Sequence, residues 1–149
     1  MTAEALVAAL DEAADLAARG APVPEAVADL VLRILGAASD TPAVLAALAS
    51  VPAGRALLRI TDGGIAIELQ AGEGHLAAER SDPKGKGPKV DATAATWLGL
   101  LGGTLKPWLA FTRGLVVCRA GIGELRWLQQ TAEALQRGYG EARGLESAR

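Results

Sequence analysis

The chain lacks most of the side chains from which catalytic and metal sites are built. Its 149 residues include one histidine, His75, one cysteine, Cys118, and few aromatic side chains, namely three Trp, one Tyr and one Phe. A single cysteine excludes an internal disulfide, and no Cys and His residues have the spacing of a zinc site. The acidic residues are scattered over predicted helix surfaces, so no carboxylate pair can be assigned to general acid and base catalysis.

These absences predict a protein that is not an enzyme and that has no cofactor and no metal. Nothing near His75 suggests a catalytic triad, and Cys118, in a predicted strand, is expected to be a small buried side chain rather than a nucleophile. The pair Gly85-Lys86 lacks the following Ser or Thr of a phosphate-binding loop. An enzyme is the least favoured alternative. If the protein were an enzyme, replacing His75 and Cys118 by alanine should abolish some turnover.

Strong charge and long apolar runs are missing too. The net charge of −2 comes without an arginine stripe or basic residues interleaved with aromatics, so no nucleic-acid partner is expected. The N-terminus, with Glu4, Asp11, Glu12 and Asp15, does not resemble a secretory signal, and no apolar run approaches the roughly 18 residues of a membrane-spanning helix. We therefore expect a soluble, cytoplasmic protein, in line with its single cysteine.

What the sequence does contain is apolar volume, mostly from Ala, Leu and Val, because hydrophobic residues make up 50% of it. Apolar residues recur with the helical period over residues 3–18, which predicts an amphipathic helix. A second helix is expected from Pro24 through Leu35, since proline suits a first turn. Thr41 is predicted to cap a third, short helix that runs through Leu48.

Strand patterns begin after Pro52. Residues 55–60 and 65–70 read as two strands joined by a tight turn at Thr61-Asp62-Gly63-Gly64. The same patterns predict three more strands, at 75–80, 90–94 and 115–119, and a polar loop at 81–89. They also predict helices at 97–102, from Pro107, and from about 121 to 137. The order predicts an α+β fold, a five-stranded mainly antiparallel sheet covered by helices on one side.

Several of these segments, taken in order, resemble the sterol carrier protein type 2 (SCP2) domain in its small stand-alone bacterial form. The matching features are the 61–65 hairpin, the strand Val90-Asp91-Ala92-Thr93, the helix at 97–103, and Leu105-Lys106-Pro107 with Ala110-Phe111 and Gly114. The resemblance covers roughly residues 40–138. The chain departs from the family at Ala120-Gly121-Ile122, where a glycine and an acidic residue are frequent, and in its additional helices at 3–35.

The resemblance implies an SCP2-like fold with an N-terminal helical extension, residues 1–38, and a lipid-binding domain, residues 39–149, together forming one compact unit. It also implies a hydrophobic tunnel for a lipid or acyl-CoA ligand: a fatty acid, an acyl-CoA or a sterol-like molecule. An Ala- and Gly-rich lining favours such a cavity, although plain core packing remains the alternative for any single residue. The residues expected to line it are Trp97, Leu98, Leu101, Leu105, Trp108, Leu109, Phe111, Val116, Leu125 and Leu128.

A second hypothesis is an accessory or scaffold module that presents a lipid intermediate, such as a quinone precursor, to a partner enzyme. Its partners would include a protein or, transiently, a membrane, and a homodimer through the N-terminal helices is a further possibility. On the last helix, Ile122, Leu125, Leu128, Ala132 and Leu135 are predicted to share one face, with Trp127 turned away from it, either incidentally exposed or as an anchor. Lys84, Lys86 and Lys89 mark either a solvated loop or a basic lip for an anionic group.

Overall fold

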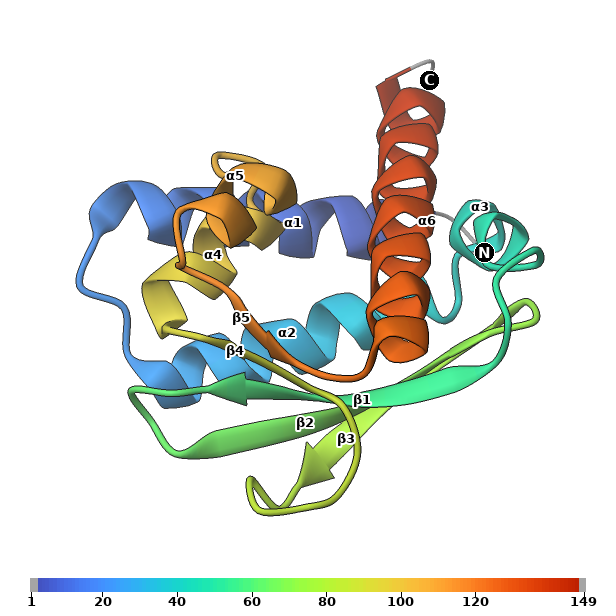
Figure 1. Ribbon diagram of the computed structural model, residues 1–149. Coiled ribbons are helices and arrows are strands. Elements are labelled where there is room, and N and C mark those ends of the chain that lie inside the picture. The colour runs from blue at the N-terminus through green and yellow to red at the C-terminus, as the bar shows by residue number, and fades with distance from the viewer. Residues whose placement is uncertain (1–2, 148–149) are drawn as a thin grey trace.

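The computed structural model describes the backbone of residues 3–147 and the side chains of residues 3–144. The helices are α1 (Glu4–Arg19), α2 (Pro24–Ala38), α3 (Pro42–Ala47), α4 (Ala94–Leu101), α5 (Pro107–Thr112) and α6 (Ile122–Ser147). The strands are β1 (Gly54–Ile60), β2 (Ile65–Gly72), β3 (His75–Ser81), β4 (Lys89–Ala92) and β5 (Val117–Arg119). Figure 1 shows their arrangement, with the helices gathered on one side of the strands.

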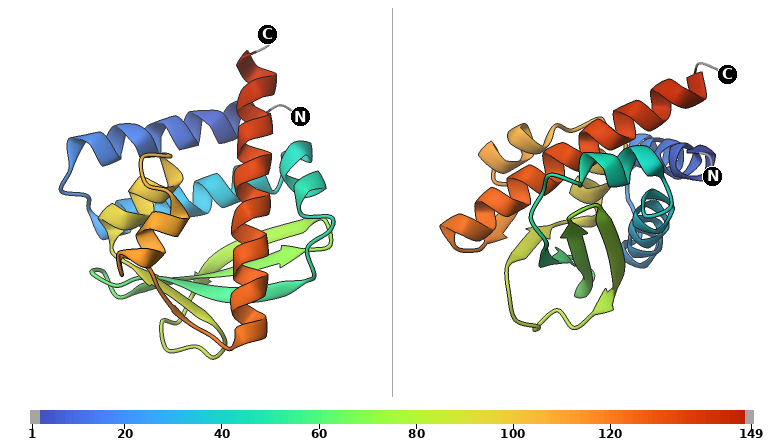
Figure 2. Two further views of the ribbon diagram at one scale, coloured as in Figure 1. Left: turned by 45° about the horizontal axis from the view of Figure 1, so that its top comes forward. Right: turned by 90° about the vertical axis from the view of Figure 1, so that its right-hand side faces the viewer.

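The strands form one open sheet in the order β3-β2-β1-β4-β5. Every neighbouring pair is antiparallel except β1 and β4, which run parallel. The predicted α+β fold with a five-stranded, mainly antiparallel sheet is therefore confirmed. We call the face that packs against the helices the inner face and the opposite face the outer face; Figure 2 shows the helical layer over the inner face from two further directions.

The alternation seen in the sequence explains how the sheet joins the core. Ile67 and Leu69 point to the inner face and are 1% and 4% exposed, whereas Gln70, next to Leu69, points outward and is exposed. This is the pattern of a strand with one face on the core. The tight turn before β2 closes at Gly64, whose φ of +62° is a conformation that L side chains rarely adopt.

The first two helices are built into the same core as the sheet. Leu6 and Leu10 of α1 and Leu30 and Ile34 of α2 are at most 2% exposed. The end of α4 lies directly on α1, because a Cβ added at Gly102 would sit 2.7 Å from the Cα of Ala14. The apolar faces of both N-terminal helices are therefore occupied by other parts of this chain.

Local corrections to the sequence prediction concern helix starts. Thr41 is the N-cap residue of α3 and Pro42 its first residue, as predicted, but the Thr41 hydroxyl donates to the carbonyl of Ala37 at 2.8 Å and makes no side-chain capping bond to α3. Thr93, instead, caps α4 by accepting a hydrogen bond from the backbone N–H of Thr96. That cap starts α4 at Ala94, three residues before the predicted Trp97, so Ala94, predicted to end a strand, is the first residue of the helix.

In the part of the chain that the structure describes, no helix is both long enough and apolar enough to cross a membrane.

Candidate functional site

A row of apolar side chains on the inner face of the sheet is only half buried. Leu58 of β1 lies opposite Val90 of β4, and Val90 lies opposite Cys118 of β5; all three have intermediate exposure. One step along the same strands, Ile60 and Ala92 are 2% and 3% exposed and belong to the core. The row Leu58–Val90–Cys118, called the floor row below, therefore marks a part of the inner face that the helices leave uncovered.

Helix α5 borders this uncovered area and contributes little to the core. Only Ala110 of its six residues is buried, whereas Trp108, Leu109 and Phe111 are 72%, 39% and 50% exposed. Its position is set by a compact connection from α4, in which the backbone N–H of Leu105 donates to the carbonyl of Gly99. Over the described residues, α5 and α6 make no extensive contact with each other.

Helix α6 presents two different stripes. Helix α6 buries one stripe of residues that follow the helical spacing of three or four: Trp127, Thr131, Ala134, Gly138 and Ala142. All of these residues except Trp127 are small, which lets α6 approach α3 closely: a Cβ at Gly138 would lie 2.7 Å from the Cα of Val44. This stripe is what fixes α6 to the rest of the protein.

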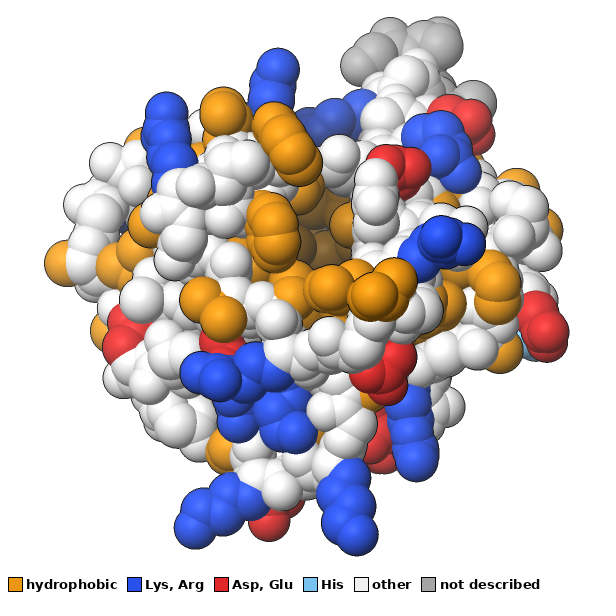
Figure 3. Space-filling view, viewed as in Figure 1, with side chains coloured by type: hydrophobic (Ala, Val, Ile, Leu, Met, Phe, Trp, Pro, Cys, Tyr) orange, Lys and Arg blue, Asp and Glu red, His pale blue; other side chains and the backbone are white. Residues whose placement is uncertain are grey.

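The second stripe of α6, the leucine stripe, contains Leu125, Leu128 and Leu135, and all three remain half exposed. Figure 3 shows a hollow floored and bordered by hydrophobic side chains between α5 and α6. We call this hollow the apolar groove, and from their half exposure we infer that the floor row lies at its base and that the exposed side of α5 and the leucine stripe border it. An open apolar concavity of this kind is typical of a site for a hydrophobic ligand.

The structure corrects the sequence interpretation of Trp127. Its side chain is 8% exposed, and its indole Nε1 donates to the carbonyl of Pro52 at 2.7 Å. The ring lies against Gly54, where a glycine leaves the room that the indole needs. Trp127 thus belongs to the buried stripe, and Ile122, predicted on the apolar face, is 84% exposed because it starts α6 beyond the core.

The ten residues predicted to line a cavity fall into two groups. Trp97 and Leu98 are 8% and 0% exposed, and the indole Nε1 of Trp97 donates to the carbonyl of Arg59 at 3.0 Å, so these two residues belong to the packed core around α4. The other eight are half buried or exposed, and they lie on the segments that surround the groove: Leu101, Leu105, Trp108, Leu109, Phe111, Val116, Leu125 and Leu128. Their contact with a ligand remains a prediction.

The sequence prediction missed the floor row. Val90 and Cys118 were assigned to strands, but their pairing with Leu58 joins three segments that are far apart in the chain. The alternation within each strand is a signal that these side chains share a face. No local signal says which strands become neighbours, so the floor row could not be assembled from the sequence.

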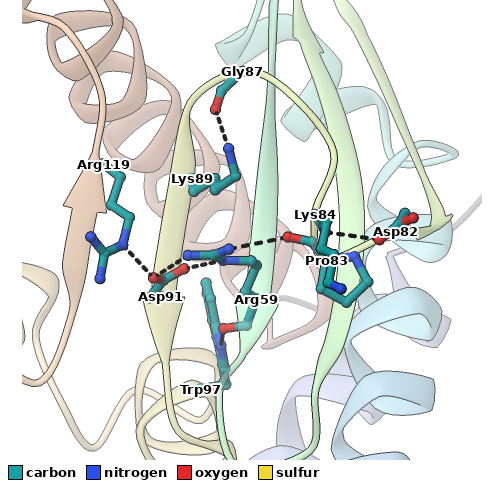
Figure 4. Close-up of polar contacts among 9 residues, drawn as sticks. All are labelled: Arg59, Asp82, Pro83, Lys84, Gly87, Lys89, Asp91, Trp97 and Arg119. Carbon is teal, nitrogen blue, oxygen red and sulfur yellow. Dashed lines mark hydrogen bonds and ion pairs between the residues drawn. The ribbon is translucent and has the colours of Figure 1, made fainter.

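The outer face of the sheet carries the most buried charge of the described residues (Figure 4). Asp91, whose side chain is 9% exposed, accepts two hydrogen bonds from the guanidinium of Arg59, both 2.6 Å, and one from Arg119 at 3.0 Å. Hydrogen bonds from Arg59, and then from Arg119, hold the pKa of Asp91 below its ordinary value against the opposing effect of burial. The third donor of Arg59 reaches the carbonyl of Pro83 at 3.1 Å and fastens the 82–88 loop to the sheet.

That loop lies on the side of the sheet away from the groove. Its Gly85 approaches Leu57, an outer-face residue, with a would-be Cβ 3.1 Å from Leu57 Cδ1. Lys84 and Lys86 are exposed at its tip, and Lys89 donates to the carbonyl of Gly87 at 3.0 Å. A ligand-binding role for these lysines remains a prediction. Because the loop lies on the outer face, these lysines would have to reach around the edge of the sheet to contact a ligand on the inner face.

The two residues with the best intrinsic chemistry are not brought together. Cys118 lies in the floor row, where burial raises the pKa of its thiol and the nearby Asp91 carboxylate adds to the effect, so the nucleophilic thiolate is disfavoured at neutral pH. His75 is exposed at the start of β3, beside a separate hollow of about 620 Å³ that also involves Arg55 and Glu73. Among residues 3–144, no three His, Cys, Asp or Glu side chains form a group that could hold a metal ion.

Comparison with known proteins gives a fold. No protein-family model matches the chain, and no curated protein matches it by sequence. The crystal structure of sterol carrier protein 2 is similar with a TM-score of 0.55 and 24% identity, over 76% of this chain and 94% of that one. A solution structure from Thermus thermophilus, described as a conserved hypothetical protein and possibly a sterol carrier protein, gives 0.54 and 25%, over 83% and 91%.

Two other similar structures carry different descriptions. A UbiJ-SCP2 ubiquinone synthesis protein is similar with a TM-score of 0.50 and 14% identity, over 80% of this chain and 98% of that one. The sec-alkylsulfatase Pisa1 from Pseudomonas sp. gives 0.53 and 18% identity, over 72% of this chain, but this chain spans only 16% of the sulfatase. The similarity to nearly full-length SCP2 structures identifies the fold as SCP2-like.

Proposed function

Since the chain has an SCP2-like fold, we propose that it binds a lipid in the apolar groove and does not catalyse a reaction on it. The observation that carries the proposal is the floor row, because three adjacent strands expose apolar inner-face side chains at the place where a helix would otherwise cover them. The similar structure named sterol carrier protein 2 supports a lipid as the occupant. A fatty acid, an acyl-CoA or a sterol-like molecule fits this chemistry, and we place the activity in the cytoplasm.

Burial of an acyl chain can supply the affinity without a polar anchor. A chain of about sixteen methylenes gains up to ~12 kcal/mol when it leaves water, at roughly 0.8 kcal/mol for each methylene. Loss of translational freedom and ordering of the chain remove several kcal/mol of that gain. Micromolar affinity, about −8 kcal/mol, is the expected result.

The absence of catalysis in this proposal rests on the chemistry of the groove. Its floor and sides are apolar, apart from the Cys118 thiol, whose pKa is raised. A protonated thiol is a poor nucleophile. Among the described residues, the structure shows no hydrogen bond from the Cys118 thiol to a side chain that could accept its proton. A Cys118→Ala variant should therefore bind lipid as the wild type does.

The sharpest test fills the groove from its floor. Val90→Trp places a large ring over the inner face, in the space of about four methylenes, so we expect fatty-acid affinity to fall by ~3 kcal/mol, roughly a hundredfold. Val117→Trp is the matched control, because Val117 lies on the neighbouring strand but on the outer face, opposite Asp91. Isothermal titration with a fatty acid below its micellar concentration measures both variants.

Native mass spectrometry of freshly purified protein gives the complementary measurement. The wild type should carry a co-purified lipid, which the Val90→Trp variant should lack. Equal fatty-acid affinity in the wild type and the Val90→Trp variant, or a wild type that neither carries nor takes up lipid, would rule out the groove as a lipid site.

The second candidate function is an accessory module that presents a lipid intermediate, such as a quinone precursor, to a partner enzyme. It is favoured by the likeness to a structure named as a ubiquinone synthesis protein and by the exposed apolar side chains of α5. Identification of the extracted ligand separates the two: a polyprenyl quinone precursor favours presentation, whereas a mixture of fatty acids favours general carriage.

A homodimer through residues 1–38 remains part of the proposal in a restricted form. The apolar faces of α1 and α2 are buried within the chain, so such a dimer would have to use their polar outer faces. Analytical ultracentrifugation over a range of concentrations decides this point, because a monomer throughout would remove the dimer.

A further inference from the structure

The exposed apolar side chains of the described residues are concentrated in one short part of the chain. Among those residues, seven large hydrophobic side chains are exposed, and six of them lie between Trp108 and Ile122; the seventh, Val23, lies between α1 and α2. The segment includes the exposed side of α5, which forms one rim of the apolar groove. Val117 lies on the outer face of the sheet, whereas Trp108, Leu109 and Phe111 lie together on α5. Scattered exposed apolar residues are normal, but three on one short helix beside a ligand site indicate an interaction surface.

The charge of the same region has one sign. From residue 92 to residue 123 the sequence contains Lys106, Arg113 and Arg119 but neither Asp nor Glu. Lys106 and Arg113 are the residues that flank α5 at its two ends, and both are exposed. Within the described residues, neither of these two cations forms an ion pair.

These observations combine two features that favour a lipid surface. Trp108, at 72% exposure, carries an indole of the kind that partitions into the interface between headgroups and acyl chains. Lys106 and Arg113 stand on either side of it, where they complement anionic headgroups. A surface that binds a protein partner more often carries carboxylates as well as cations, because an arrangement of both charges fixes the register of the two proteins.

We propose that α5, with Trp108 and Phe111 inserted and Lys106 and Arg113 on the headgroups, docks the protein on an anionic bilayer surface. The inference rests on the proposed lipid-binding function, because docking at α5 brings the rim of the apolar groove to the membrane from which a lipid would enter. In Figure 3, hydrophobic side chains over α5 border the hollow, and Lys or Arg side chains lie on the same face. The conformation of α5 suits this role, since Ala110 is its only buried side chain and Gly103 and Gly114, both with positive φ, bracket it.

The test is sedimentation with two kinds of vesicle, one of phosphatidylcholine alone and one of equal parts of phosphatidylcholine and phosphatidylglycerol. The wild type should bind the anionic vesicles and lose most of that binding at high salt. Trp108→Ser with Phe111→Ser should weaken binding by roughly tenfold for each ring removed. Lys106→Glu with Arg113→Glu should weaken it by at least about 25-fold, from about fivefold for each cation removed, because the new carboxylates also repel the anionic headgroups.

Two controls match these variants. Lys84→Glu with Lys86→Glu makes the same charge change on the loop against the outer face, and Val23→Ser removes an exposed apolar side chain elsewhere. Both controls should bind vesicles like the wild type. Circular dichroism melting should show that all variants remain folded, because every substituted side chain is exposed.

The outcomes distinguish the docking surface from the lipid site. Fatty-acid binding measured without vesicles should be unchanged in the Lys106→Glu, Arg113→Glu variant, while vesicle binding falls. A wild type that takes up fatty acid but sediments with neither vesicle would overturn the docking inference and leave the proposed function intact. Equal binding of the α5 variants and the wild type, or loss of binding in the Lys84, Lys86 control alone, would also overturn it, since the bilayer would then contact another surface.

Discussion

Replacing Gly54 by alanine tests how α6 is held over the sheet. A Cβ at this position would lie 2.6 Å from the indole Nε1 of Trp127 and 2.8 Å from its Cδ2. The indole cannot shift freely, because Nε1 also donates to the carbonyl of Pro52 at 2.7 Å. We therefore expect Gly54→Ala to lower the free energy of unfolding by about 1–3 kcal/mol, the usual cost of overpacking.

The same substitution should cost nothing when the indole is absent. Trp127→Ala alone should lower the free energy of unfolding by about 3–5 kcal/mol, since it leaves a cavity and removes a hydrogen bond. A methyl group added at Gly54 would then enter that cavity, so the two changes should couple by about 1–3 kcal/mol, the whole cost of the single Gly54→Ala variant.

Urea unfolding followed by circular dichroism, applied to the wild type, the two single variants and the double variant, measures this coupling. Gly36→Ala on α2 is the matched control, because no atom lies within 4 Å of its would-be Cβ, and it should be neutral or stabilise by up to about 1 kcal/mol. If Gly54→Ala had the same cost with and without the indole, the contact between β1 and α6 described above would be wrong.

Two further predictions concern stability. Asp91→Asn should lower the free energy of unfolding by about 1–3 kcal/mol, since it leaves the guanidinium of Arg59 without its charged partner. The pKa of Asp91 is lowered in the folded state, so its contribution to stability is complete above the ordinary value of 3.8 and is lost as the pH falls through the folded value. Urea titrations should therefore show the same difference in unfolding free energy between Asp91→Asn and the wild type throughout the neutral range. That difference should shrink in the acidic range where Asp91 becomes protonated. Removal of residues 1–38 should prevent folding, because Leu6, Leu10, Leu30 and Ile34 leave the core; a truncated chain with native circular dichroism and cooperative melting would contradict this.

The sequence predicted the elements well because their signals are local. Apolar periods of 3.6 and 2, with proline at helix starts and glycine at turns, located all six helices and five strands that the described residues form. The boundaries were less accurate where a cap or a close approach decides them. Helix α6 continues to Ser147, beyond the predicted end near residue 137, since Gly138 fits against Val44 instead of ending the helix.

The candidate site was harder to predict, because it depends on which face of α6 approaches the core. Hydrophobic periodicity favours the stripe with the larger apolar side chains, and it selected Leu125, Leu128 and Leu135. The structure buries the other stripe, in which Thr131 and Gly138 are not hydrophobic but are small enough for close packing on α3. Helix packing depends on shape as well as on apolar area, and a sum of hydrophobicity does not record shape.

The groove follows from this choice of face. Since α6 is fixed by its small-residue stripe, its leucines stay half exposed, and α5 makes no extensive contact with α6 over the described residues. A six-residue helix is about 9 Å long at 1.5 Å for each residue, whereas the half-exposed leucines from Leu125 to Leu135 extend over about 15 Å. Helix α5 is therefore shorter than the leucine stripe, and Leu58, Val90 and Cys118 stay half exposed. A close-packed interior would have closed this space with larger side chains; the apolar character of the space they leave is the physical reason to expect a hydrophobic guest there.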